Sequence, residues 1–412
     1  MNRKYQHPWF HFILLQIFVF VLPFNPGFCS VIIGLLAINW ILGLLRKQFL
    51  LSTHNFLPYL GLVLFYAWHV IALFWSKDIR SGQFEITTKL SFILIPLLFS
   101  AFQLKSNELT KVYQSFVCGA SIACIYLFGR ALFNYIKMKA EIANGAYLHD
   151  FGNNLFFKDR ISPFVHPSYL AMYLTFALWL IYMNWNTQFL PRKARNSITL
   201  LMLVFIVLLN SKMGILSIVG MGLYNCYILF FVKKNIWTAV STFSIFIMLS
   251  FGILFLIPQV KDRLNTAFQS VSGHQENTPK IGSTSERLIL WKGAYIAIKD
   301  NVMLGSGTGS ANEYLYQYCQ RVAPDFKNEH KLNAHNQFLQ TFLCTGIIGI
   351  ILLLWIIIMP LQKAIGKGDL IYLGFYFLTI GNLMVESMFE TQAGIFFFTI
   401  FNGIGIIKKS DK

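Results

Sequence analysis

A single histidine stands directly before a long apolar run near the end of the sequence. The stretch NAHNQFLQTFLCTGIIGI (333–350) places His335 where a membrane helix would begin. An ionisable side chain is costly in lipid, so one placed here lies either at the water interface or in a functional site. A neutral imidazole at this position can accept a proton from an attacking hydroxyl near physiological pH. The alternative is an interfacial histidine that caps the next helix, with Asn336 as a further capping candidate.

Basic side chains in the segments on the same side of the membrane could bind phosphate. They are Arg160, Lys212, Arg287 and Lys292. Arginine stays charged, and its planar fork matches phosphate oxygens. These cations could stabilise a departing phosphate in place of a metal, since the outer loops lack the paired carboxylates that hold a divalent ion. We therefore expect no metal and no other cofactor.

Three of these cations also have a structural alternative. Arg287 could extend its charge to water from an amphipathic helix. Lys212, in LLNSKMGIL, could simply mark a tight turn. Arg160 and His166, in KDRISPFVHPSYL, could be interfacial anchors.

Two carboxylates flank the last outer turn, in VESMFETQAG. A solvated turn accounts for Glu390, whereas Glu386 lies close enough to the apolar run to be costly there. Together with His166 and Asn336 they complete the set of candidate site residues.

The composition indicates how these residues must be positioned. The chain of 412 residues is 56% hydrophobic and only 12% charged, against about 25% charged in soluble proteins. Apolar runs of roughly 20 residues recur along the whole length. This predicts an all-α polytopic membrane protein. The net charge of +17 comes from Lys and Arg pairs between the apolar runs, which is the pattern of cytoplasmic loops and not of a nucleic-acid surface.

The hydrophobic pattern predicts about twelve transmembrane helices, with both termini cytoplasmic. The expected spans are 10–25, 29–45, 57–76, 86–103, 110–136, 166–184, 197–210, 213–232, 236–257, 336–359, 370–387 and 391–407. They form a first membrane unit (1–257), a large periplasmic loop (258–335) and a second membrane unit (336–412). A shorter outer segment is expected at 137–165.

The large loop itself contains two recognisable stretches. Residues 286–300 predict an amphipathic helix, with Leu288, Trp291, Tyr295 and Ile298 on one face. The following GSGTGS (305–310) lacks the Lys-Ser/Thr ending of a phosphate-binding loop and is interpreted as a flexible turn.

The stretch from His335-Asn336 to Gly346-Ile-Ile-Gly349 resembles the HN…GxxG signature of the O-antigen ligase and polymerase superfamily. The number of spans, the large loop before the signature helix and Ser-Glu-Arg287 leading into Trp291 extend the resemblance, as do the downstream glycines at 305, 307 and 309. The resemblance implies that His335 is catalytic and that Arg287 binds the lipid-linked diphosphate. Ser211-Lys212 stands where the family commonly has Ser-Arg, which keeps the charge but loses the bidentate geometry.

With this resemblance, the chain looks like a bacterial inner-membrane glycosyltransferase of the O-antigen ligase type. It would move a glycan from a polyprenyl diphosphate carrier to a hydroxyl acceptor, first of all lipid A-core, on the periplasmic face. Lys212 and Arg160 would assist Arg287 in binding the diphosphate. A polymerase and a protein oligosaccharyltransferase remain open. A flippase or transporter would need charges along the middles of several helices, and only Arg130 and, less clearly, Lys89 fit.

Overall fold

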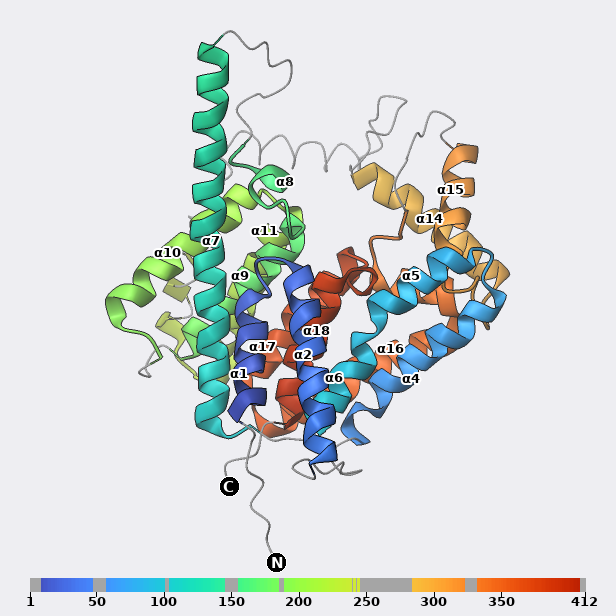
Figure 1. The fold of residues 1–412 in the computed structure, drawn as a ribbon, viewed down its shortest axis with the longest axis horizontal. Coiled ribbons are helices and arrows are strands. Elements are labelled where there is room, and N and C mark those ends of the chain that lie inside the picture. Colours follow the sequence, from blue (N-terminus) through green and yellow to red (C-terminus); the bar gives the residue numbers. More distant parts are fainter. Residues whose placement is uncertain are drawn as a thin grey trace, which may run out of the picture.

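Helices make up the regular structure of the part of the chain that can be described. The computed structural model describes residues 9–46, 57–100, 104–144, 155–184, 189–238, 240–241, 243–244, 284–322 and 332–407. Every regular element assigned within these ranges is a helix (Figure 1). The predicted all-α fold class is therefore confirmed.

The described helices have the following order along the chain. The first part contains α1 (Trp9–Val21), α2 (Pro26–Leu45), η1 (Leu57–Tyr59), α4 (Leu60–Ile71), η2 (Ala72–Trp75), α5 (Ile79–Lys89), α6 (Ser91–Ser100), α7 (Ser106–Ala143), α8 (Lys158–Ile161) and α9 (Pro167–Met183). The second part contains α10 (Arg192–Leu209), α11 (Lys212–Tyr227), η3 (Ile228–Val232), α14 (Thr284–Asp300), α15 (Ala311–Val322), α16 (Gln337–Lys367), α17 (Leu370–Val385), η4 (Met388–Glu390) and α18 (Gln392–Ile407).

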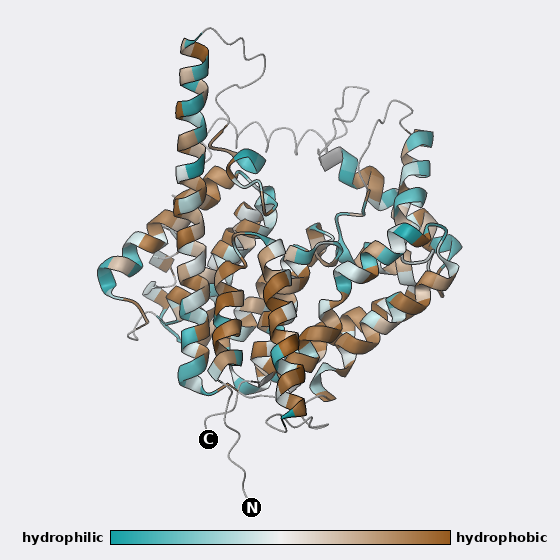
Figure 2. Ribbon diagram, in the orientation of Figure 1, coloured by the Kyte–Doolittle hydropathy of each residue, from teal (hydrophilic) through white to brown (hydrophobic). Residues whose placement is uncertain are grey.

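Several of these helices have the length and composition of membrane spans. Six described stretches qualify, namely Pro26–Leu45, Leu57–Trp75, Ile79–Phe99, Ser106–Ala143, Lys212–Val232 and Gln337–Lys367. Shorter apolar helices occur at Trp9–Val21, Pro167–Met183, Leu370–Val385 and Gln392–Ile406. In Figure 2 the hydrophobic residues predominate in the lower, central helices of the view. In contrast, α8, α15 and the upper, C-terminal end of α7 are more hydrophilic. The chain is a helical membrane protein.

The predicted spans have helices at their places, with some changed ends. The ninth expected span, 236–257, lies mostly outside the described residues, so the total of about twelve stays a prediction. The helix expected at 86–103 begins at Ile79, where Asp78 accepts a hydrogen bond from the Ser81 amide at 3.0 Å, and is divided at Leu90. α7 continues to Ala143 because residues 137–143 contain neither glycine nor proline, so part of the outer segment expected at 137–165 is helical.

The centre of the bundle is α9. Almost every residue of this helix is buried, which is what a helix that is apolar on all sides requires. It packs on α7, α10, α11, α17 and α18. The Phe176 ring lies edge-on to Phe401 at 4.8 Å and to Phe397 at 5.5 Å. These contacts fix the helix whose first turn carries part of the candidate site.

α14 is the helix expected at 286–300, but it buries a different face. Leu290, Ala294 and Ile298 are buried, whereas Leu288 and Tyr295 are exposed. The buried face packs on α15 and α16. The expected helix is therefore present, and of its expected apolar face Ile298 is buried in the protein whereas Leu288 and Tyr295 are exposed.

α16 is broken at Gly346, which has φ 66° and ψ −161°. The amides of Ser306 and Gly307 donate to the carbonyls of Leu343 and Cys344 at 2.8 and 2.9 Å. In place of the flexible turn expected at GSGTGS (305–310), the structure shows a segment that supplies hydrogen bonds to the broken helix. This pairing holds the preceding α14 against the helix that follows His335.

Candidate active site

Glu386 is the centre of a polar cluster at the ends of several helices. It follows Val385, the last residue of α17, and its side chain is 9% exposed. Arg287 donates from Nη2 to Oε1 at 2.7 Å, and His335 Nδ1 lies 3.1 Å from Oε2. The Ser168 hydroxyl reaches Oε1 at 3.5 Å. The carboxylate of Glu386 thus connects His335 and Arg287, the two residues that the sequence singled out.

His335 is held in an unusual backbone conformation. Its φ is 43°, in the left-handed region that residues with a side chain seldom adopt. The His335 amide donates to Asn333 Oδ1 at 2.9 Å, and the Ala334 carbonyl accepts from Trp291 Nε1 at 2.8 Å. Strained residues held in this way by their surroundings concentrate at functional sites.

The capping alternative for His335 is wrong, because Asn336 is the residue that caps α16. Asn336 Oδ1 accepts from the Leu339 amide at 3.0 Å. Its Nδ2 donates to the Met384 carbonyl at 2.8 Å, which ties the start of α16 to the end of α17. Asn336 therefore positions the segments that carry His335 and Glu386.

α14 reaches the cluster with two side chains one turn apart. Residues four apart share a helix face, and here Arg287 contacts the Glu386 segment while Trp291 contacts the Ala334 carbonyl. Arg287 also donates from Nη1 to the Val385 carbonyl at 2.7 Å. The guanidinium therefore spans two acceptors and keeps 28% of its side chain exposed.

The surroundings of Glu386 favour its ionised form. Burial alone would raise the pKa of this carboxyl, but the hydrogen bond from His335 and the charges of Arg287, His335 and His166 together lower the pKa below its ordinary value. An ionised carboxylate only accepts hydrogen bonds, so Nδ1 of a neutral His335 carries the proton. Nε2 is then the proton acceptor of the imidazole.

The lowered pKa predicts how stability depends on pH. A carboxyl whose folded-state pKa lies below its unfolded value stabilises the fold above the unfolded value, and this contribution is lost as pH falls through the folded value. We expect wild type to unfold at a higher temperature than Glu386→Gln near pH 7. The difference should persist down to the ordinary value of 4.5 and shrink below it. Thermal unfolding in detergent across this range measures it, and a difference that grows as pH falls below this ordinary value would contradict the assignment.

Two further candidates lie beside this cluster. His166 is exposed and caps α9, with its Nδ1 accepting from the Ser168 amide at 3.4 Å. The Ser168 hydroxyl lies 3.2 Å from that of Ser211, which caps α11 and precedes the exposed Lys212. The expected Ser-Lys turn therefore adjoins the residues around Glu386.

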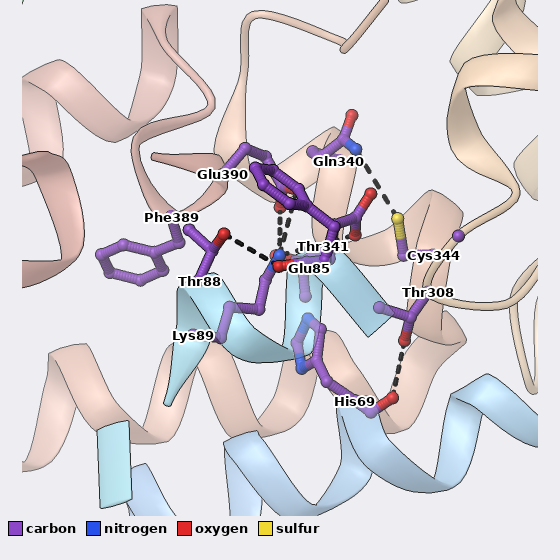
Figure 3. Close-up of polar contacts among 12 residues, drawn as sticks. His69, Glu85, Thr88, Lys89, Thr308, Gln340, Thr341, Cys344, Phe389 and Glu390 are labelled. Carbon is purple, nitrogen blue, oxygen red and sulfur yellow. Dashed lines mark hydrogen bonds and ion pairs between the residues drawn. The ribbon is translucent and has the colours of Figure 1, made fainter. Parts of the chain in front are cut away.

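Arg160 and Glu390 lie in other surroundings. Arg160 is exposed on α8, where its carbonyl accepts from Arg130 Nη1 at 3.4 Å, and its role in binding phosphate stays a prediction. Glu390 does not belong to a solvated turn. It forms an ion pair with Lys89, whose Nζ is 2.9 Å from Oε1 (Figure 3).

The sequence did not indicate that two serines connect the helix starts. Ser168 and Ser211 are both buried, and each stands in the first turn or cap of a helix beside a candidate residue. A serine at such a place signals a cap, and its second role toward Glu386 becomes visible only in three dimensions. Within the ranges that the structure describes, no group of three or more His, Cys, Asp and Glu residues is placed to hold a metal ion.

The fold and this cluster define a helical membrane protein with a histidine, a carboxylate and an arginine gathered at the ends of its helices. Residues 197–354 match the family described as O-antigen ligase, and this range includes α14 and His335. The match confirms the resemblance to the O-antigen ligase superfamily. The chain is also similar to an uncharacterized protein from Haemophilus influenzae, with 28% identity over 154 residues, or 36% of the length of each protein.

Proposed function

We propose that the protein is a glycosyltransferase that moves a glycan from a polyprenyl diphosphate carrier to a hydroxyl acceptor. The observation that carries the proposal is the contact of His335 with the ionised Glu386, beside Arg287, within and next to the segment that matches the O-antigen ligase family. The pair supplies a base, and the arginine supplies a cation for a phosphate. We place the reaction on the periplasmic face of the inner membrane.

The reaction would proceed by one displacement. His335 Nε2 takes the proton of the acceptor hydroxyl as its oxygen attacks the anomeric carbon. The bond from that carbon to the diphosphate oxygen breaks, and the electron pair leaves with the polyprenyl diphosphate. Glu386 stabilises the imidazolium through Nδ1, as a buried carboxylate does in other histidine-based sites. Attack opposite to the leaving group inverts the anomeric configuration.

The cations serve the leaving group. Arg287 and Lys212 would stabilise the charge that develops on the diphosphate, and Arg160 would add to the same field. Arg287 holds Glu386 through one nitrogen and the Val385 carbonyl through another. A bound diphosphate would approach the exposed part of this guanidinium, so the group that orders the carboxylate would also contact the donor.

The surface glycans of a deletion strain test the function and separate its variants. Full-length chains stranded on the carrier, with unmodified lipid A-core, mean that the protein is a ligase, which is the outcome we expect. A single repeat on the core means a polymerase, and loss of glycan from proteins alone means an oligosaccharyltransferase. A strain with unchanged surface glycans would overturn the proposal.

Lys212 gives a prediction at the level of one side chain. If it contacts the diphosphate from the start of α11, Lys212→Arg should retain or improve transfer, because a guanidinium adds bidentate contacts. Lys212→Ala should weaken transfer. Initial rates of the purified variants with the lipid-linked donor measure this. Equal rates for wild type, Lys212→Arg and Lys212→Ala would limit the residue to its place after the Ser211 cap.

A further inference from the structure

The segment that carries Glu386 is short, lies between two helices and is fixed at both ends. It runs from Glu386 to Glu390, between α17 and α18. At its first residue it contacts Arg287 and His335. At its last residue, Glu390 receives Lys89 Nζ at 2.9 and 3.0 Å on its two carboxylate oxygens. The position of Glu386 therefore depends on what holds the other end.

Two further contacts fix the middle of this segment. The Phe389 amide donates to Gln337 Oε1 at 2.6 Å, two residues after His335 in the chain. The Phe389 ring lies 5.0 Å from that of Phe92 and 4.9 Å from that of Phe398. Phe389 is fully buried. The segment is thus held against α16, α6 and α18 while its two glutamates point to different partners.

Lys89 is an unusual residue for this place. It ends α5 and is completely buried. Its Nζ also lies 3.6 Å from Glu85 Oε2, one turn earlier, and Figure 3 shows the three charged side chains turned toward one another beside His69. Burying ions is costly, and apolar side chains of similar volume are often as stable. A buried ion pair can instead fix one geometry, because its partners must meet at defined distances.

From this arrangement we infer that Lys89 is a positioning residue for the reaction at His335. Its ion pair with Glu390 holds the 386–390 segment so that Glu386 meets Nδ1 of His335 and the Arg287 guanidinium. The inference rests on the proposed function for its effect on turnover. Its structural part, the placement of the segment, stands independently of the reaction.

The experiment compares Lys89→Met and Lys89→Arg with Glu386→Gln in detergent or nanodiscs. Lys89→Met should lower turnover by about 10²-fold, the effect of a misplaced catalytic pair, with little change in donor binding. Lys89→Arg should restore much of it. Combining Lys89→Met with Glu386→Gln should lower turnover hardly further than Glu386→Gln alone, because both act through the same carboxylate. Lys137→Met removes an exposed pair with Glu141 and is the matched control.

A second variant guards against simple misfolding. Combining Lys89→Met with Glu85→Met and Glu390→Met replaces all three charged side chains by apolar ones and should keep the fold. A fully active and well-folded triple-Met protein would overturn the inference, as would multiplicative losses in the Lys89→Met, Glu386→Gln combination.

Hydrogen exchange separates the inference from the proposed function. In Lys89→Met, peptides covering residues 384–391 should exchange faster than in wild type, while peptides from α7 keep their rate. If wild type transfers no glycan but Lys89→Met still shows the faster exchange, the placement of the segment is supported and the proposed function is refuted. If wild type transfers glycan and Lys89→Met shows unchanged exchange and unchanged turnover, only the placement of the segment by Lys89 is refuted.

Discussion

His335→Ala should lose most of its turnover and still bind the lipid-linked donor. A general base typically contributes ~10²–10⁴-fold to rate, and the structure gives His335 what a base needs. Its Nδ1 lies 3.1 Å from an ionised carboxylate, and Nε2 is left as the proton acceptor. The donor, in contrast, is held by cations that the substitution leaves in place. Turnover should therefore fall while donor affinity changes little.

The measurement is transfer by purified His335→Ala in nanodiscs, together with direct binding of the polyprenyl diphosphate donor. The side chain is 35% exposed, so its removal should not open a core cavity, and the unfolding temperature should remain near that of wild type. Near-normal transfer by the well-folded variant would make His335 an interfacial residue after all, and the reaction would need another base.

The positions of the helices along the chain could be predicted because an apolar run is visible in consecutive residues of the sequence. A membrane helix is recognised from the composition of consecutive residues, so nearly every expected span has a helix at its place. Helix ends were less predictable. α5 begins ahead of the expected residue 86 because Asp78 caps it, and a polar first turn does not resemble a membrane span. α16 similarly runs to Lys367, ending at Gly368 with φ 60°.

The candidate site was predictable only as separate residues. His335 and Arg287 stood out by residue type and motif. Glu386, which connects them, lies 51 residues after His335 and 99 residues after Arg287. No local pattern encodes such a pairing. Glu386 was recognised as costly beside an apolar run, which is the signal of a buried partner, although the partner could not be named. Ser168 gave only the signal of a helix start.

Glu390 shows the opposite failure. A glutamate in a turn is usually solvated, and that reading was wrong because its partner, Lys89, lies 301 residues earlier in the chain. Lys89 also contacts Glu85, four residues earlier in α5, and this pair was not predicted either. The third member could be found only from the packing of the 386–390 segment against α5 and α16.

Arg287→Ala should lose both donor binding and turnover, unlike His335→Ala. Removing one preorganised hydrogen-bond donor from a developing anion costs about 10²–10³-fold in rate. The same guanidinium would also contact the diphosphate of the bound lipid-linked substrate. It also bonds the Val385 carbonyl and Glu386 at 2.7 Å each. Arg287→Lys should recover only part of both, because one ammonium cannot span two acceptors and a phosphate as a planar fork does.

Glu386→Gln makes the roles separable. It removes the charge that holds the guanidinium and orients the imidazole, but it leaves Arg287 available to the donor. Turnover of Glu386→Gln should therefore fall while its affinity for the lipid-linked donor is kept or increased. Arg287→Ala, in contrast, should bind this donor weakly, whatever its rate of transfer. Donor titrations and single-turnover rates on the same preparations measure both quantities. Unchanged donor affinity in folded Arg287→Ala would assign Arg287 to ordering Glu386 alone, and the diphosphate would then need Lys212 or Arg160.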